Sequence, residues 1–242
     1  MSTNTQYGRS VDPEELLLRT DWSSVEHCCP NVAPATPVIL RQLLDNDPGK
    51  QGAALRDLHQ AVTHQGTFYS ATAPAVSFVA AILGHPRTLS KVTDQSSWEA
   101  ANFGAEPRFL LRVGLLNWLG STAWGADEES PDGYEADIEA FRTLRPTLYD
   151  AIQPFLTDDE PEIRHAALAA VLPMLAAPEL AHQAECLRDA VWALAADSAP
   201  YRQRAIDTLA SWGEDITPFQ QYRRTPDDVR AHAEGFADDP PF

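Results

Sequence analysis

Basic residues are scarce in this chain. Its 242 residues include 18 Lys and Arg against 35 Asp and Glu, so that the formal net charge at pH 7 is −17. A surface this negative repels the phosphates of nucleic acids and the anionic headgroups of a membrane. The charge therefore disfavours both as partners and favours a basic protein, although a negative surface can also serve solubility alone.

Cysteine is scarce too, and long apolar runs are missing. The three cysteines are Cys28, Cys29 and Cys186, and because the first two are adjacent they do not suggest a disulfide framework. This usage is typical of a reducing compartment. The N-terminal sequence lacks the apolar core of a signal peptide, and no apolar run reaches the length of a membrane-spanning helix. We therefore expect a cytoplasmic protein with no membrane association.

The short motifs that carry common chemistry are also missing. The sequence has no glycine-rich phosphate loop, no GxSxG and no HExxH. His27, Cys28 and Cys29 do not have the paired spacing of a zinc site. His59 and His64 are five positions apart and so lie off a common helical face, which favours the end of a helical hairpin, with a pocket as the alternative. We expect no catalytic residue, no metal and no cofactor.

What the sequence does contain is apolar residues at helical spacing, interrupted by Asp, Asn and Pro. A first helix is predicted to begin at Asp12-Pro13, with Asp12 as the N-cap, proline in the first turn and acidic residues after it. Such segments continue to about residue 213, and no alternating strand pattern competes with them. The sequence therefore predicts an all-α fold.

An internal repeat organises these helices. Residues 156–171 (LTDDEPEIRHAALAAV) align with 194–209 (LAADSAPYRQRAIDTL) at an offset of 38 residues. The copies share an acidic residue, an arginine and a small residue, which are Asp159 and Asp197, Arg164 and Arg202, and Ala167 and Ala205. A unit of this length is one helix pair that buries a face on its neighbours.

Two further copies are degenerate. In residues 43–58, Gln51 stands in place of the arginine, and in 107–120 the arginine is Arg112. Four helix pairs result, at about 36–64, 73–120, 141–177 and 183–213. Inserted loops interrupt them at about 85–106 and 121–138, and a capping tail follows at 214–242. We expect all of this to form one domain over residues 1–242.

The Asp…Arg…Ala-Leu…Leu spacing resembles HEAT repeats, including the short form of phycobilisome-lyase-like proteins. The front part, RTDWSSVEHCCPNVAPATPVILRQLL, is similar to uncharacterised HEAT-repeat proteins of actinobacteria. The resemblance implies an α-α superhelix, or solenoid. It also implies that Asp159, Arg164, Asp197, Arg202 and Arg112 are structural and form a ladder between neighbouring units.

The family includes members of three functional classes. Many bind proteins, some are lyases or hydroxylases, and some bind nucleic acid. Iron-binding HEAT hydroxylases carry His-Glu pairs, and this chain has no His-Glu dipeptide. DNA-binding members need a basic concave groove, which the excess of acids disfavours. The favoured hypothesis is a non-catalytic protein-binding solenoid. The alternatives are a lyase- or hydroxylase-like enzyme and a nucleic-acid-binding protein on the same scaffold.

The two insertions are the predicted binding elements, because loops inserted in a regular array often form its binding face. Residues 126–140 hold seven acids and no Lys or Arg. Aromatic residues beside acids suit a basic protein surface, and small acidic bacterial solenoids include immunity proteins that neutralise basic toxins. The candidate partner-binding residues are Trp98, Phe103, Trp124, Asp127, Glu128, Glu129, Asp132, Tyr134 and Glu135. The alternative is a solvated acidic linker whose aromatic residues fold back onto the core.

Overall fold

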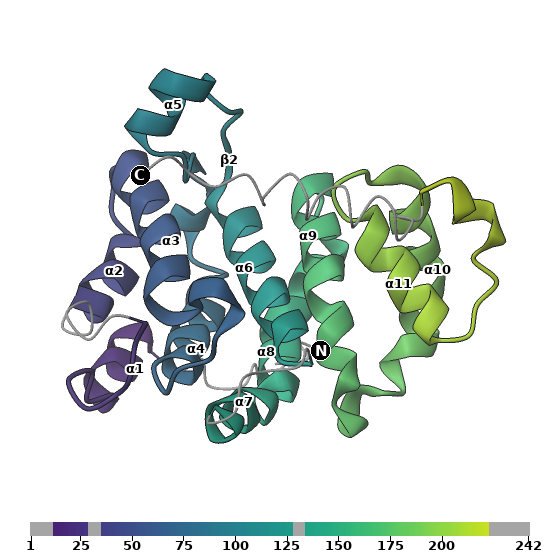
Figure 1. Ribbon diagram of the computed structural model, residues 1–242, viewed down its shortest axis with the longest axis horizontal. Helices are drawn as coiled ribbons and strands as arrows, with labels where there is room; N and C mark the ends of the chain where they lie inside the picture. The colour runs from purple at the N-terminus through teal and green to yellow at the C-terminus, as the bar shows by residue number, and fades with distance from the viewer. Residues whose placement is uncertain (1–11, 29–34, 128–133, 223–242) are drawn as a thin grey trace, which may run out of the picture. The chain divides into compact units, whose positions relative to one another are not determined.

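The computed structural model describes residues 12–28, 35–127 and 134–222 (Figure 1). These residues are mostly helical, which confirms the all-α class. No helix among them is long and apolar enough to cross a membrane. The contacts within the chain define two compact units, one within residues 1–184 and one within 185–242, and each is described by itself. The single domain over 1–242 stays a prediction.

The first unit begins with four helices, α1 (Pro13–Arg19), α2 (Thr36–Gln42), α3 (Pro48–Val62) and α4 (Thr72–Ile82). Asp12 caps α1 by accepting a hydrogen bond from the backbone N of Glu14, as the sequence predicted. α3 ends in a short 3-10 turn, His64–Gly66, where Gly66 has a φ of 77° that favours glycine. α2 packs against α3 in the range where the sequence predicts the first helix pair, at about 36–64.

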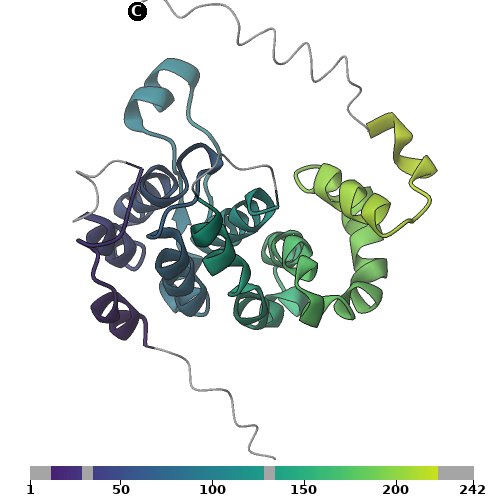
Figure 2. The same cartoon turned by 60° about the horizontal axis from the view of Figure 1, so that its bottom comes forward.

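The first insertion is more structured than the predicted loop. After the 3-10 turn η3 (Pro86–Leu89), strand β1 (Lys91–Val92) pairs in antiparallel fashion with β2 (Phe109–Leu110). Between the strands lies α5 (Ser97–Phe103), which begins with a capping box formed by Ser96 and Glu99. Both views show α5 standing out from the neighbouring helices (Figure 1 and Figure 2).

A glycine on α3 lets the base of this insertion approach. A Cβ atom on Gly52 would overlap the backbone carbonyl oxygen of Thr93, which directly follows β1. Gly52 is fully covered, and its helix therefore touches the β1 segment backbone to backbone. This contact decides where α5 is held relative to α3.

The rest of the first unit packs around α6 (Leu111–Gly125). It comprises α7 (Glu135–Arg142), α8 (Arg145–Ile152), η4 (Gln153–Thr157), α9 (Pro161–Val171), η5 (Leu172–Ala176) and η6 (Pro178–Leu180). α6 contacts both α3 and α9, and its Leu115, Leu116 and Leu119 are buried. The second insertion also differs from a loop, because residues 121–125 complete α6 and 135–138 begin α7.

The second unit contains α10 (Gln183–Asp197) from Glu185 onward, α11 (Arg202–Ser211) and the 3-10 helix η7 (Thr217–Tyr222). Trp192 packs on Phe219 with ring centroids 5.3 Å apart, so η7 covers the apolar side of α10. The tail after residue 222, including the helix expected near Pro226, lies outside the described residues.

The arginine position of the repeat has a recurring structural role. Arg164 donates to the backbone carbonyl of Asp158 at 2.6 Å, and Arg202 donates to the carbonyl of Ala195 at 2.9 Å. Each side chain thus satisfies a carbonyl near the end of the element that precedes its own helix. Gln51 does the same by donating to Leu43 at 3.0 Å, so a neutral amide serves where the repeat usually has a guanidinium.

The predicted ladder between neighbouring repeats has Asp159 and Asp197 as its acidic residues, and the structure differs from it at these positions. Arg112, only 7% exposed, donates to the Thr88 hydroxyl at 3.1 Å and pairs with the Asp158 carboxylate at 3.9 Å. Asp159 and Asp197 are exposed and form no ion pair within the described ranges. The acid that balances the buried guanidinium is therefore Asp158, since it faces inward from the end of η4.

Candidate binding groove

A groove of about 630 Å³ lies between α3 and the α5 insertion. Arg56, His59 and Gln60 of α3 form one side of it. The insertion forms the other side with two aromatic residues, three carboxylates and an amide, which are Trp98, Phe103, Asp94, Glu99, Glu106 and Gln95. The structure therefore places both predicted aromatic residues of the first insertion in one groove.

Trp98 and Phe103 form an exposed aromatic pair. Their side chains are 65% and 76% exposed, and their rings meet edge to face with centroids 5.7 Å apart. Large aromatic side chains are enriched where proteins bind proteins. The pair faces solvent rather than the core, unlike the alternative in which it folds back.

The carboxylates make the groove negative. Hydrogen bonds from the Ser96 side chain, and then from its backbone, lower the pKa of Glu99, which keeps that carboxylate ionised. Arg56 offsets one charge, but its guanidinium donates to the backbone carbonyl of Asp94 at 2.9 Å and also lies near the Asp57 carboxylate. Three carboxylates against one engaged guanidinium leave an excess of negative charge.

Gln95 holds the two ends of the α5 segment together. Its Nε2 donates to the Gly104 carbonyl at 2.9 Å, and its Oε1 accepts from the backbone N of Glu106 at 3.0 Å. Gly104 itself ends α5 with a φ of 88°. The amide therefore fixes the chain on both sides of the aromatic pair, so the wall of the groove is built before any partner binds.

His59 contributes an uncharged wall. Loss of surrounding water lowers its pKa, while the negative charge of Asp94 acts in the opposite direction and only partly offsets this. The imidazole meets the Trp118 ring edge on, with centroids 6.5 Å apart. At neutral pH the ring is therefore neutral and adds no positive charge to the groove.

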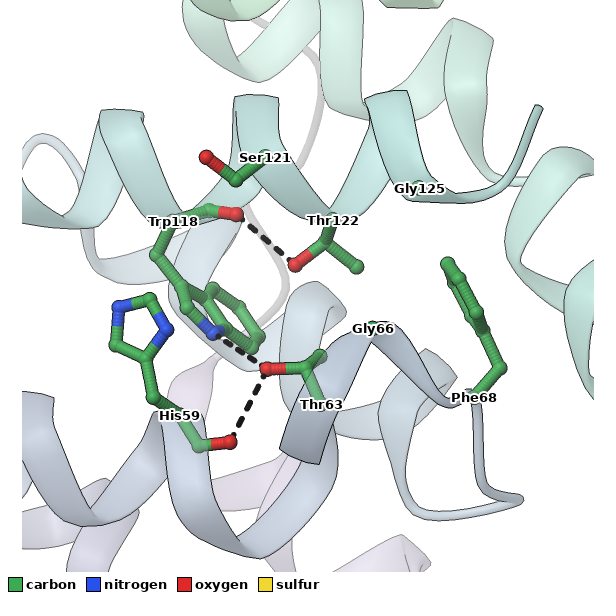
Figure 3. Close-up of a pocket in the computed structure, with 8 residues that line it drawn as sticks. All are labelled: His59, Thr63, Gly66, Phe68, Trp118, Ser121, Thr122 and Gly125. Carbon is green, nitrogen blue, oxygen red and sulfur yellow. Dashed lines mark hydrogen bonds between the residues drawn. The ribbon is translucent and has the colours of Figure 1, made fainter. Parts of the chain in front are cut away.

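His59 also lines a second hollow, a cavity of about 210 Å³ (Figure 3). Its walls are Phe68 and Trp118, two glycines and a few hydroxyl side chains, which are Gly66, Gly125, Thr63, Ser121 and Thr122. α6 supplies Trp118, Ser121, Thr122 and Gly125, His59 lies on α3, and the others follow the end of α3. The two hollows are thus neighbours that share one side chain.

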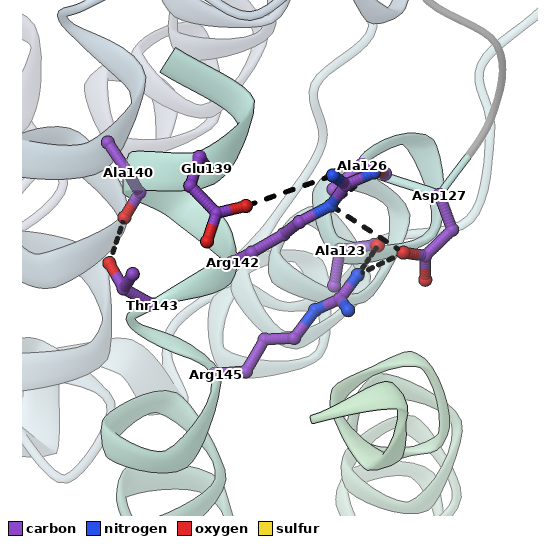
Figure 4. A network of polar contacts seen from close by, with 8 residues as sticks. All are labelled: Ala123, Ala126, Asp127, Glu139, Ala140, Arg142, Thr143 and Arg145. Carbon is purple, nitrogen blue, oxygen red and sulfur yellow. Dashed lines mark hydrogen bonds and ion pairs between the residues drawn. The ribbon is translucent and has the colours of Figure 1, made fainter. Parts of the chain in front are cut away.

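Those candidates of the second insertion that the structure describes do not line the groove. Asp127 accepts a hydrogen bond from the Nη2 of Arg145 at 2.7 Å and pairs with Arg142 at 3.9 Å (Figure 4). The two arginines also donate to the carbonyls of Ala123 and Ala126 at the end of α6. Asp127 therefore balances the cations that cap this helix, where positive charge is favourable.

The other second-insertion candidates are scattered. Tyr134 precedes α7 and packs edge to face on Tyr69, with centroids 5.9 Å apart. Glu135 is exposed in the first turn of α7, and Trp124 is half-buried on α6. Glu128, Glu129 and Asp132 lie outside the described residues.

The remaining cysteine and histidine candidates take local roles. His64 is hydrogen-bonded to the side chain of Gln60 at 2.8 Å, and the backbone N of Cys28 donates to the Ala61 carbonyl at 3.2 Å. Cys29 lies outside the described residues. Where the structure describes the chain, no cluster of three or more His, Cys, Asp or Glu is arranged to hold a metal.

Sequence reasoning found the aromatic pair but missed its acidic neighbours. Asp94, Glu99 and Glu106 lie within or beside the predicted insertion at 85–106, so their proximity to Trp98 and Phe103 was visible in the sequence. The contribution of α3 was not, because Arg56 is distant along the chain and reaches the insertion only through the fold.

Comparisons of the chain with protein-family models, with curated proteins and with solved structures gave no match.

Proposed function

We propose that this chain is a HEAT-like helical solenoid that binds a basic segment of another protein in the groove between α3 and α5, and that it performs no catalysis. The observation that carries the proposal is the exposed Trp98–Phe103 pair beside the carboxylates of Asp94, Glu99 and Glu106. The recurring donors at Gln51, at Arg112 and in the later helix pairs support the solenoid.

The chemistry of the groove suits lysine and arginine side chains. A guanidinium or ammonium group over an aromatic ring gains about 0.5–2 kcal/mol, the larger value when water is excluded. The nearby carboxylates offer charge-assisted hydrogen bonds to the same groups. Phosphate would be repelled by these carboxylates, so the groove does not support the nucleic-acid alternative.

The net charge of −17 supports a basic partner over the whole surface, because complementary charge raises the rate of encounter. An immunity-type role, in which the chain covers a small basic toxin, is the version of this function that the resemblance and the acidity favour together.

The test is binding of basic peptides to the full chain. Peptides of about twelve residues that contain Arg and Lys in a Gly/Ser background are titrated by fluorescence anisotropy, with Glu-containing peptides of equal length as the reference. We expect the basic peptides alone to bind, and we expect the double variant Trp98→Ala/Phe103→Ala to weaken them by about ten-fold or more, as the loss of interfacial aromatic residues usually does.

Leu18→Ala is the matched control, because Leu18 is a large exposed apolar residue on α1 that does not line the groove. It should bind the peptides like the wild type. The proposal fails if the wild type binds no basic peptide better than the acidic reference, or if the double variant, shown to be folded by circular dichroism, binds as tightly as the control.

A further inference from the structure

We infer that the partner segment is recognised at two adjoining positions, with a cationic side chain in the groove at Trp98–Phe103 and an aromatic or leucine-sized side chain in the cavity between Trp118 and Phe68. The inference rests on the proposed function of the groove and adds a second specificity element to it. Its basis is that His59 lines both hollows. Figure 3 shows His59 among the residues of the cavity.

The chemistry of the cavity favours an apolar occupant. The Phe68 and Trp118 rings belong to buried side chains and present carbon surface to it. Gly66 and Gly125 add backbone without side chains, which leaves the space open. No described lining residue carries a charge while His59 is neutral, so a cation would find no counter-ion here.

The threonine hydroxyls of the cavity already have partners. Trp118 Nε1 donates to Thr63 Oγ1 at 3.2 Å, and Thr63 Oγ1 donates to the His59 carbonyl at 3.4 Å. Thr122 Oγ1 donates to the Trp118 carbonyl at 2.9 Å. An apolar side chain entering the cavity therefore breaks none of these bonds and leaves no donor newly unsatisfied.

The size of the cavity fits one side chain. An apolar cavity of roughly 150 Å³ is sufficient to hold benzene, and this one is about 210 Å³. A benzyl or isobutyl group fits, whereas a whole folded element does not. Because the groove that shares His59 with this cavity carries the negative charge, the two hollows together select a segment in which an Arg or Lys lies close to a Phe or Leu.

The experiment compares short peptides that differ only at the apolar position. Acetylated, amidated peptides carry an Arg-Arg pair followed, after one to four glycines, by either Phe or Ser. We expect the Phe peptide of the best spacing to bind the full chain about ten-fold more tightly than its Ser counterpart, measured by isothermal titration calorimetry.

Gly125→Leu tests whether this advantage comes from the cavity. A Cβ atom on Gly125 lies 3.8 Å from Phe68 Cε2, an ordinary contact, so a leucine at the end of α6 fills the cavity without a backbone clash. We expect Gly125→Leu to reduce the Phe-to-Ser ratio to about one. Gly125→Ala is the matched control, since a methyl group leaves most of the cavity open, and should keep the ratio.

The outcomes separate this inference from the proposed function. If Trp98→Ala/Phe103→Ala weakens the Phe and Ser peptides alike but the wild type shows no Phe advantage at any spacing, the groove stands and the cavity inference is overturned. A Phe advantage that persists in Gly125→Leu overturns it as well. If no Arg-Arg peptide binds the wild type, the proposed function itself is wrong, and the inference falls with it.

Discussion

At the scale of single residues, His27 is a buried imidazole with an unsatisfied nitrogen. Its Nδ1 lies 3.0 Å from the Val25 carbonyl, and its Nε2 has no hydrogen-bond partner in the described part of the chain. Desolvation lowers its pKa below the ordinary value of 6.5, although the Val25 carbonyl opposes this. The folded protein therefore favours the neutral imidazole of His27, and keeping it unprotonated costs more free energy as the pH falls.

The stability of the fold should consequently fall at acid pH. Below about pH 6.5, His27 binds a proton in the unfolded chain but stays unprotonated in the folded protein, because its folded pKa is lower. The contribution of His27 to stability is therefore fully present above pH 6.5. The free energy of unfolding declines as the pH falls from there toward the lowered pKa, by at most about 1.4 kcal/mol per pH unit. Urea unfolding at pH 7 and pH 5 measures this. His27→Leu should show a smaller decline than His64→Gln, and equal declines would contradict the assignment.

His59 makes a related prediction for peptide binding. It is neutral at pH 7 because its pKa is lowered, so acidification through that pKa adds a positive charge beside Asp94, Arg56, Glu99 and Glu106. Affinity for an Arg-Arg peptide should fall several-fold as the pH decreases through this lowered pKa, which lies below 6.5. His59→Gln should have a flatter profile between pH 7 and 5, and an unchanged profile would show that the carboxylates alone set it.

At the scale of secondary-structure elements, the contact of Gly52 with Thr93 holds the insertion against α3. Gly52→Ala should push β1 and α5 away, because the new methyl group would overlap the Thr93 carbonyl. We expect a loss of roughly 1–3 kcal/mol in the free energy of unfolding, together with weaker peptide binding. Gly84→Ala is the control, since its Cβ would meet open space. If Gly52→Ala is as stable as the wild type and binds the peptide equally well, the contact of Gly52 with Thr93 does not hold the insertion in place.

The capping of α6 predicts a structural rather than a binding role for Asp127. Arg145 is 4% exposed, and its buried Nε has no hydrogen-bond partner where the structure describes the chain, so the Asp127 carboxylate is its main charge partner. Asp127→Asn should lower stability by roughly 1 kcal/mol, a modest figure because the carboxylate is partly exposed. Basic-peptide affinity should stay within about two-fold, and a larger loss would restore Asp127 as a partner-binding residue.

Much of the helical framework could be predicted because its signals are local. Asp12 and Pro13 mark a helix start within one turn, and the repeat of residues 156–171 at 194–209 fixes helix spacing without any long-range contact. The first insertion could be placed at about 85–106 for the same reason. Its helix was missed because α5 is only seven residues long, too short for an apolar period to emerge.

The groove itself could be predicted only in part. Trp98 and Phe103 were identified since they lie where the repeat fails, but their neighbours depend on contacts between distant segments. Whether Arg56 faces Asp94 is decided by the absence of a side chain at Gly52, which no pattern in the local sequence reveals. The acidic pattern also suggested Asp127 as a binding residue, whereas its partner Arg145 became visible only in the fold.

At the scale of the whole molecule, we expect the net charge of −17 to affect the rate of encounter with a basic peptide more than the contacts in the bound complex. Added salt should slow association with a basic peptide and leave dissociation nearly unchanged, because screening acts on separated charges beyond about one Debye length. Stopped-flow measurements between roughly 0.05 and 0.3 M NaCl would report the two rates separately. A salt effect confined to dissociation would place the main electrostatic contribution in the bound groove instead.

The paired strands at the foot of α5 have a consequence for how such a protein could diversify. Because Lys91 lies opposite Leu110, the two ends of the intervening segment leave the helical frame side by side. The segment between the strands can therefore change in length and composition while the strand pair holds its two ends in the same place. Changes in the residues between the strands, 93–108, would alter one wall of the groove and so its choice of partner, while α3 would keep supplying the opposite wall.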